Sequence, residues 1–222
     1  VLVVAAGSGQ RVGGGVLKQY REIAGVPMLL RALRPFVSHP DVKHVVVALP
    51  AMHAAAPPEW LASLTGESLT CVAGGVERHS SVGRALAALD PACTTVLVHD
   101  AARPFVERST IDAVLAAVRG GEAAVAAVPL SDTLKEVGPD RLVRRTVPRE
   151  GLWRAQTPQG FPRELLERAH AAEPAADATD DAFLIERMGL PVRVVPDSPG
   201  NFKVTTAEDL ALAEAWAVAR RR

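Results

Sequence analysis

The stretch VLVVAAGSGQR at residues 1–11 decides the fold, because an apolar run passes directly into a glycine-rich turn that ends in a cation. Apolar residues on consecutive positions are typical of a strand that is buried on both faces of a sheet. Gly7 and Gly9 allow the backbone N–H groups of the turn to approach an anion closely. Ligands of open α/β sheets usually bind where such strands end. The stretch therefore predicts a phosphate-binding loop after the first strand.

The loop departs from the two common nucleotide-binding fingerprints. Val12 occupies the place of the third glycine in G-x-G-x-x-G, and the pattern G-x-x-x-x-G-K-[ST] does not occur in the sequence. Arg11 and Lys18 supply two positive charges, and the three glycines at residues 13–15 give the chain the freedom to bring both to one triphosphate. A solvated surface loop is the structural alternative. By itself, the loop predicts only a nucleotide or phosphate site.

The rest of the chain alternates short β-branched runs with helical patterns, which predicts an α/β fold with a doubly wound, mostly parallel sheet. We expect strands at residues 1–5, 44–49, 69–73, 94–98, 123–128 and 192–195. We expect helices at residues 27–37, 79–89, 110–119, 163–172, 180–188 and 207–220. Thr205 with Glu208 three residues later predicts a capping box at the start of the last helix.

Residues 131–147 do not follow this alternation of strands and helices. Two alternating polar and apolar runs flank the turn sequence Gly138-Pro139-Asp140, which predicts a β-hairpin that projects from the sheet. A two-stranded hairpin is marginally stable by itself in water. We therefore expect an arm at about residues 131–150 that packs on a second copy and forms a homodimer. Because no linker-like stretch divides the chain, residues 1–222 are predicted to form a single domain that carries this arm.

The amino-acid composition limits the binding partners and the cellular compartment that we expect for the protein. The 25 basic and 25 acidic residues cancel, so we expect neither nucleic acid nor a membrane surface as a partner. No apolar run approaches the roughly 20 residues of a membrane helix. Cys71 and Cys93 are too few for a disulfide framework, which favours a reducing, cytoplasmic location. The six histidines have no ligand-like spacing, so no protein-bound zinc is predicted.

Seven motifs give a more specific indication by their order and spacing. They are AAGSGQR (5–11), LKQY (17–20), GGVERHSSV (74–82), VHDAARP (98–104), DTLK (132–135), VPREGLWRAQTPQGF (147–161) and NFKVT (201–205). With these motifs the chain resembles the methylerythritol phosphate cytidylyltransferase family from residue 3 to about residue 216. The resemblance implies a Rossmann-like nucleotidyltransferase of isoprenoid biosynthesis that transfers CMP from CTP to 2-C-methyl-D-erythritol 4-phosphate and releases pyrophosphate.

The same resemblance implies roles for individual residues. Arg11 and Lys18 match the family's catalytic cations at the α-phosphorus, where fixed charges stabilise the transition state of phosphoryl transfer. The matched nucleotide-binding positions are Ala5, Ala6, Gly7, Gly9, Gly74, Gly75, Ser81, Asp100, Ala101 and Arg103. The matched positions for the polyol phosphate substrate are Thr133, Arg149, Thr157, Thr179 and Lys203. If Thr133 and Arg149 flank the arm, the site is completed across a dimer interface.

Several of these positions also have structural interpretations. Asp100 stands at the end of an expected strand, where a carboxylate suits hydrated Mg²⁺ or substrate hydroxyls. The alternative is that Asp100 caps a helix or pairs with Arg103. Ser81 could be a helix cap, and Gly74-Gly75 an ordinary tight turn. The expected cofactor is Mg²⁺ or another divalent cation, held mainly by the phosphates of CTP with Asp100 as a further candidate.

Three other functions compete with this prediction. A cytidylyltransferase for a pentitol phosphate such as ribitol 5-phosphate shares the loop, GG-x-ER and DAAR features. A sugar-1-phosphate nucleotidylyltransferase would usually carry Gly-Thr-Arg where this chain has Gly9-Gln10-Arg11. A catalytically inactive nucleotide-binding homologue would have no need for both Arg11 and Lys18.

Overall fold

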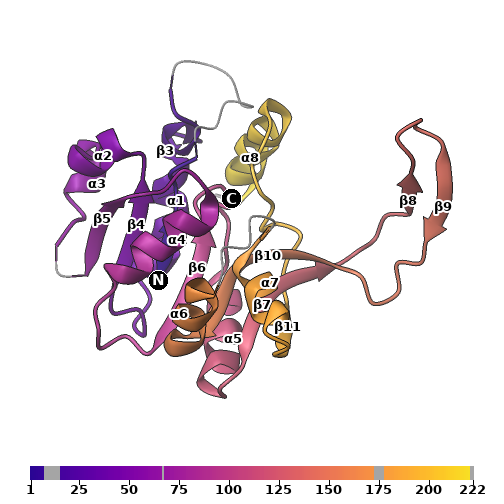
Figure 1. Cartoon of the computed structure of the whole chain (residues 1–222). Coiled ribbons are helices and arrows are strands. Elements are labelled where there is room, and N and C mark those ends of the chain that lie inside the picture. The colour runs from indigo at the N-terminus through magenta and orange to yellow at the C-terminus, as the bar shows by residue number, and fades with distance from the viewer. Residues whose placement is uncertain (8–15, 67, 173–177, 221–222) are drawn as a thin grey trace.

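A central seven-stranded sheet organises the chain, whose computed structural model describes residues 1–7, 16–66, 68–172 and 178–220 (Figure 1). The strand order is β11-β7-β10-β6-β1-β4-β5. All neighbouring strands are parallel except β10, which is antiparallel to both β6 and β7. The predicted doubly wound, mostly parallel sheet is confirmed. The strands are β1 (Leu2–Val4), β4 (Val45–Leu49), β5 (Leu69–Ala73), β6 (Thr95–Asp100), β7 (Ala123–Pro129), β10 (Trp153–Pro162) and β11 (Val192–Pro196).

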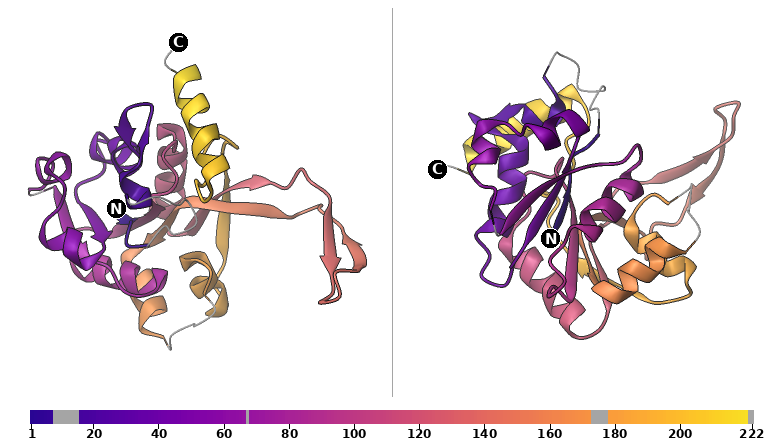
Figure 2. Two further views of the ribbon diagram at one scale, coloured as in Figure 1. Left: turned by 90° about the horizontal axis from the view of Figure 1, so that it is seen from above. Right: turned by 60° about the vertical axis from the view of Figure 1, so that its left-hand side comes forward.

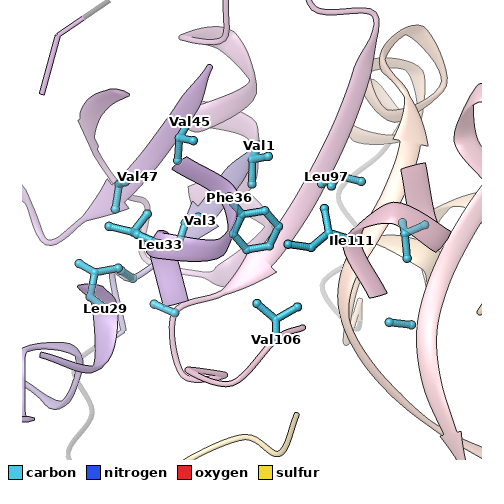
Figure 3. Close-up of a cluster of buried hydrophobic side chains, with 14 of the residues drawn as sticks. Val1, Val3, Leu29, Leu33, Phe36, Val45, Val47, Leu97, Val106 and Ile111 are labelled. Carbon is cyan, nitrogen blue, oxygen red and sulfur yellow. The ribbon is translucent and has the colours of Figure 1, made fainter. Parts of the chain in front are cut away.

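Helices cover both faces of the sheet, and each strand contributes alternate side chains to the two apolar layers. One layer contains Val3 of β1 together with side chains of α1 (Met28–Val37) and α5 (Arg108–Arg119). Phe36 of α1 lies in this layer, among Val1, Leu97 and Ile111 (Figure 3). The opposite layer contains Leu2 and side chains of α4 (Arg78–Ala87), α6 (Arg163–Ala171) and α7 (Asp181–Arg187).

The direction of winding reverses at β1. From β1 the chain runs through α1 to β4, and then through the short helices α2 (Ala51–Ala55) and α3 (Glu59–Ala62) to β5. It then returns through α4 and pairs β6 with the other side of β1. The carboxyl ends of β1 and β6 therefore meet at the topological switch point, where open α/β sheets bind ligands.

The six predicted strands and six predicted helices are all present, with ends shifted by at most two residues. The sequence did not predict β10, because Gln156, Thr157, Pro158 and Gln159 interrupt the apolar alternation that marks a strand. The structure has a register shift between Ala155 and Gln159 in the pairing of β10 with β7. The remaining elements missed were the short helices α2 and α3, η2 (Lys18–Tyr20), β2 (Glu22–Ile23) and β3 (Val26–Pro27).

The last helix, α8 (Ala207–Ala219), begins with a capping box one residue later than predicted. Thr206 accepts a hydrogen bond from the backbone N–H of Asp209, and the Asp209 carboxylate accepts one from the N–H of Thr206. The predicted pair of Thr205 and Glu208 is therefore wrong, because the cap is the residue immediately before Ala207. α8 packs over β2, and Glu214 accepts a hydrogen bond from the N–H of Ala24.

The predicted hairpin is present as β8 (Leu134–Val137) and β9 (Val143–Val147), which pair in an antiparallel manner. Figures 1 and 2 show this pair as an arm that extends far from the sheet and its helices. Every residue of β8 is exposed, as are most residues of β9. No helix in the described ranges combines the length and apolar character that crossing a lipid bilayer requires.

Candidate active site

A cleft of about 460 Å³ opens at the switch point, at the carboxyl ends of β1 and β6. Its walls come from segments within residues 4–7, 18–19, 75–81, 100–102 and 203–205. These segments lie far apart in sequence, so the fold itself brings the site together. Of the predicted site residues, those that line the cleft are Ala5, Ala6, Gly7, Lys18, Gly75, Ser81, Asp100, Ala101 and Lys203.

The floor of the cleft is the end of β1. The backbone N–H of Ala5 donates to the carbonyl of Ala48 on β4 at 2.8 Å, and the N–H of Ala101 donates to the carbonyl of Val4 at 3.1 Å. Both neighbours of β1 thus fix the point at which the chain leaves the sheet. Gly9 and Arg11, which were predicted to continue this loop, lie outside the described residues.

Lys18 approaches the cleft from η2, and its Nζ donates to the carbonyl of Val204 at 3.0 Å. The next residue, Gln19, is buried, and its Nε2 donates to the carbonyl of Ala5 at 2.8 Å. This bond ties the turn that carries Lys18 to the end of β1. Gln19 belongs to the motif LKQY, but the sequence predicted no role for it.

The turn after β5 forms a second wall and leaves no room for larger side chains. A Cβ atom at Gly74 would lie 2.3 Å from the Cβ of Ala6, and one at Gly75 would lie 2.3 Å from the Cβ of Ser80. The buried hydroxyl of Ser81 accepts a hydrogen bond from the N–H of Gly75 at 3.0 Å. Glu77, not Ser81, is the N-cap residue of α4. Ser81 therefore holds the turn in place from below.

Asp100, the last residue of β6, lies between two cations. Its Oδ1 is 3.2 Å from Nε of Arg78, and its Oδ2 is 2.8 Å from Nζ of Lys203. Burial would raise the pKa of the Asp100 carboxyl, but the charges of Arg78 and Lys203 hold that pKa well below its usual value. Asp100 is therefore ionised, and the alternative pairing with Arg103 is not the one observed.

A buried network supports Asp100 from beneath. The hydroxyl of Thr157 accepts a hydrogen bond from the N–H of Asp100 at 3.1 Å and lies 2.9 Å from Nδ1 of His99. Nε2 of His99 is 3.0 Å from the carbonyl of Arg103, so Nε2 carries the proton and Nδ1 accepts from Thr157. Burial lowers the pKa of His99 to about 4, which keeps the ring neutral. Thr157 thus lies under the cleft floor, and its predicted substrate contact stays a prediction.

Arg103 has a different environment from its neighbours in the DAAR motif. Its guanidinium donates to the carbonyls of Asn201 at 2.8 Å and Ala155 at 3.3 Å, and the side chain is buried. Arg103 therefore joins the segment before Lys203 to β10. Its predicted contact with the nucleotide stays a prediction.

The remaining predicted substrate positions do not line the cleft. Thr133 and Arg149 lie at the base of the arm, where the guanidinium of Arg149 donates to the carbonyl of Ser131. Thr179 is exposed and directly precedes Asp180, the N-cap residue of α7. Within this copy, none of these three residues lines the cleft together with Asp100.

Arg78 was not predicted as a site residue, although it belongs to the motif GGVERHSSV. It lines the cleft, and besides its contact with Asp100 its Nη1 lies 2.6 Å from Oδ2 of Asp181. Ion pairs with Asp181 and Asp100 raise the pKa of Arg78 above its ordinary value, against the opposing effect of burial. A charged residue at the start of a helix is common and does not by itself indicate a site. Only the motif GGVERHSSV could have identified Arg78 from the sequence.

Comparisons with known proteins identify the family to which the chain belongs. A family model described as 2-C-methyl-D-erythritol 4-phosphate cytidylyltransferase matches residues 1–219. Relatives with that name from Frankia casuarinae and Salinibacter ruber are each 48% identical, covering 96% and 97% of this chain and 79% and 91% of their own. The crystal structure of the Thermus thermophilus protein of that name has a TM-score of 0.81 at 36% identity, covering 98% of both chains. The chain belongs to the 2-C-methyl-D-erythritol 4-phosphate cytidylyltransferase family.

Proposed function

We propose that this enzyme transfers CMP from CTP to 2-C-methyl-D-erythritol 4-phosphate, giving 4-diphosphocytidyl-2-C-methyl-D-erythritol and pyrophosphate. Within a member of this family, one observation carries the proposal. The cleft at the switch point brings the cations Lys18, Arg78 and Lys203 to one site beside glycine turns with little room for side chains. Two anionic reactants repel each other, so a site that joins them needs several fixed cations.

The reaction is an in-line displacement. An oxygen of the acceptor's phosphate attacks the α-phosphorus of CTP, a new P–O bond forms, and the bond to the β-phosphate oxygen breaks as pyrophosphate leaves. The acceptor phosphate is ionised near neutral pH, so the step needs no general base. Lys18 and Arg11 are assigned to the charge that develops on the α-phosphate oxygens, where fixed donors stabilise the transition state.

The nucleotide is assigned to the half of the cleft between the end of β1 and the turn after β5. Gly75 and Ser81 line this half, and the close approach of Gly74 to Ala6 leaves backbone groups to contact the base. The acceptor is assigned to the side of Lys203, with Thr157 and Thr179 on neighbouring segments. Lys203 is suited to this role because its side chain is 42% exposed beside Asp100.

Mg²⁺ is assigned to the bound CTP and not to a protein cage. Among the described residues, no group of three His, Cys, Asp or Glu side chains could hold a metal ion. Asp100 suits one contact to hydrated Mg²⁺, but Arg78 and Lys203 engage its two oxygens. With both oxygens of Asp100 engaged, Mg²⁺ would arrive already bound to the triphosphate and would neutralise part of its charge.

The arm of a second copy would complete the acceptor site. Thr133 and Arg149 lie on an exposed two-stranded arm, and an isolated arm of this kind gains stability by packing on a partner. In a symmetric dimer, an arm that reaches the partner's cleft would do so in both directions, so each copy would supply these residues to the other. Cys71 and Cys93 are both free thiols, which is consistent with the expected action in the reducing cytoplasm.

Pyrophosphate release from CTP and Mg²⁺ tests the proposed function, with methylerythritol phosphate and ribitol 5-phosphate as separate acceptors. We expect turnover with methylerythritol phosphate that falls at least about 10²-fold in Lys18→Ala. Preference for ribitol 5-phosphate would retain the chemistry and overturn the acceptor. Release with neither acceptor would favour a nucleotide-binding protein without catalysis.

A further inference from the structure

Arg78 bridges two carboxylates that belong to different parts of the fold. Its Nε is 3.2 Å from Oδ1 of Asp100 at the end of β6, and its Nη1 is 2.6 Å from Oδ2 of Asp181 at the start of α7. The Arg78 side chain is 25% exposed towards the cleft, whereas the Asp181 side chain is only 1% exposed. The guanidinium therefore connects a cleft carboxylate to an anchor inside the protein.

We propose that Arg78 is a positioning residue for the transfer reaction, which fixes the place and orientation of the Asp100 carboxylate by bridging it to buried Asp181. This inference rests on the proposed function, because that function gives Asp100 its task beside the triphosphate. It adds a residue, and an anchor outside the cleft, to the groups that prepare the site.

Asp181 is a suitable anchor because neighbouring side chains fix the position of both its carboxylate and its backbone. Its Oδ1 is 2.9 Å from Nε2 of His170, and its backbone N–H donates to Oε1 of Gln159 at 3.1 Å. Nε2 of Gln159 in turn donates to Asp180 at 2.8 Å. Because these contacts fix the Asp181 carboxylate, it cannot move together with the Arg78 guanidinium. Any movement of Arg78 would therefore break the ion pair with Asp181.

The planar guanidinium is suited to the bridge for a geometric reason. Its N–H groups point in fixed directions, so one arginine can hold two carboxylates at a set angle. A lysine ammonium is a single point charge on a flexible chain, and it would balance charge without setting an angle. Lys203, which contacts the other oxygen of Asp100, is of this second kind. The two cations beside Asp100 thus make different contributions.

Arg78→Lys keeps the positive charge at this position but removes the fixed geometry of the guanidinium. We expect kcat for pyrophosphate release to fall at least about 10-fold while KM for CTP changes less than about threefold, because misplacement of a reacting-site group costs rate more than binding. Asp181→Asn keeps the shape of the anchor but removes its charge, and we expect a comparable fall although Asp181 does not line the cleft. In the double variant, the loss should match the larger single loss, since both changes break one bridge.

Arg163→Lys is the matched control. Arg163 is also cross-linked, to Glu167 at 2.7 Å and to the carbonyl of Asp90 at 2.8 Å, but it lies at the opposite end of β6 from the cleft. Its kcat should remain within about twofold of wild type. Thermal unfolding of each variant confirms that the protein is folded at the assay temperature, and Asp181→Asn carries the test if Arg78→Lys does not fold.

Wild-type kcat in Arg78→Lys and Asp181→Asn would overturn the inference, and so would losses that add in the double variant. Those results, obtained beside normal wild-type turnover, would leave the proposed function intact. Failure of the wild type to release pyrophosphate with methylerythritol phosphate would instead overturn the proposed function.

Discussion

The cleft and the arm both carry predicted substrate residues, but the chain organises them in opposite ways. In the cleft, Asp100 is 8% exposed and is held by side chains from α4 and from the segment before α8. On the arm, the Arg145–Glu136 pair at 2.6 Å links β9 only to β8, and both side chains are largely exposed. Side chains of a single copy thus hold Asp100 in the cleft, whereas no described residue of the arm lines the cleft of its own copy.

Removal of a cleft cation should have the largest effect. In Lys203→Ala, we expect kcat/KM for methylerythritol phosphate to fall about 10³-fold, because the acceptor phosphate would lose the cation that we assign to it and Asp100 would lose one of two ion pairs. The control is Lys135→Ala, which removes an exposed lysine of the arm that contacts Thr146 at 2.7 Å. Similar losses of kcat/KM in both variants would show that activity depends on the net charge of the protein and not on a cation in the cleft.

Removal of the arm cation tests whether the arm acts on the other copy. We expect Arg149→Ala to lower kcat/KM about 10²-fold. If the sites are shared in a symmetric dimer, mixing Arg149→Ala subunits with Lys18→Ala subunits should restore about a quarter of wild-type activity, because half of the dimers then contain one intact site. Mixtures with no more activity than the separate variants would place Arg149 outside the partner's site.

A smaller effect should follow from filling the space at the nucleotide turn. In Gly74→Ala, the new Cβ would lie 2.3 Å from the Cβ of Ala6 and 2.9 Å from the hydroxyl of Ser81. We expect the free energy of unfolding to fall by about 1–3 kcal/mol and KM for CTP to rise. Gly83→Ala in helix α4 is the control, since its Cβ would lie 3.8 Å from Nδ1 of His170 in α6, an ordinary van der Waals distance. Chemical denaturation of both variants should show a loss only for Gly74→Ala.

The same contrast explains how much the sequence could predict. The strands were predictable because β1, β4 and β6 are buried on both faces, so burial itself produces continuous apolar runs. The arm was predictable for the opposite reason, since an exposed hairpin alternates around its turn residues. β10 was missed because its polar side chains point into buried networks, and no local pattern distinguishes such a strand from a loop.

From the sequence, site residues could be predicted only where they belong to a motif or follow the end of a strand. Asp100, Lys18 and Lys203 were found in this way, and the structure places all three at the cleft. Arg78 was missed because its importance depends on Asp181, which is 103 positions away in the sequence. Only the folded chain shows that these two residues meet.

The smallest effect that we predict concerns the buried support of the cleft and depends on pH. His99 has a pKa of about 4 in the folded protein because it is buried, whereas an unfolded chain has a histidine pKa of about 6.5. As the pH falls through 6.5, the unfolded chain therefore binds a proton that the folded protein does not bind, and stability decreases. Between pH 8 and pH 6, His99 alone should lower the free energy of unfolding by about 1 kcal/mol. In urea titrations, His99→Gln should reduce the slope by this amount, while His79→Gln should retain the contribution of His99. Burial also lowers the pKa values of His44 and of the Val1 amino group, so a smaller slope should remain in His99→Gln. The arm contains no histidine, so we expect the difference between the two slopes to come from His99 beneath the cleft. A slope in His99→Gln equal to that of wild type would contradict this contribution.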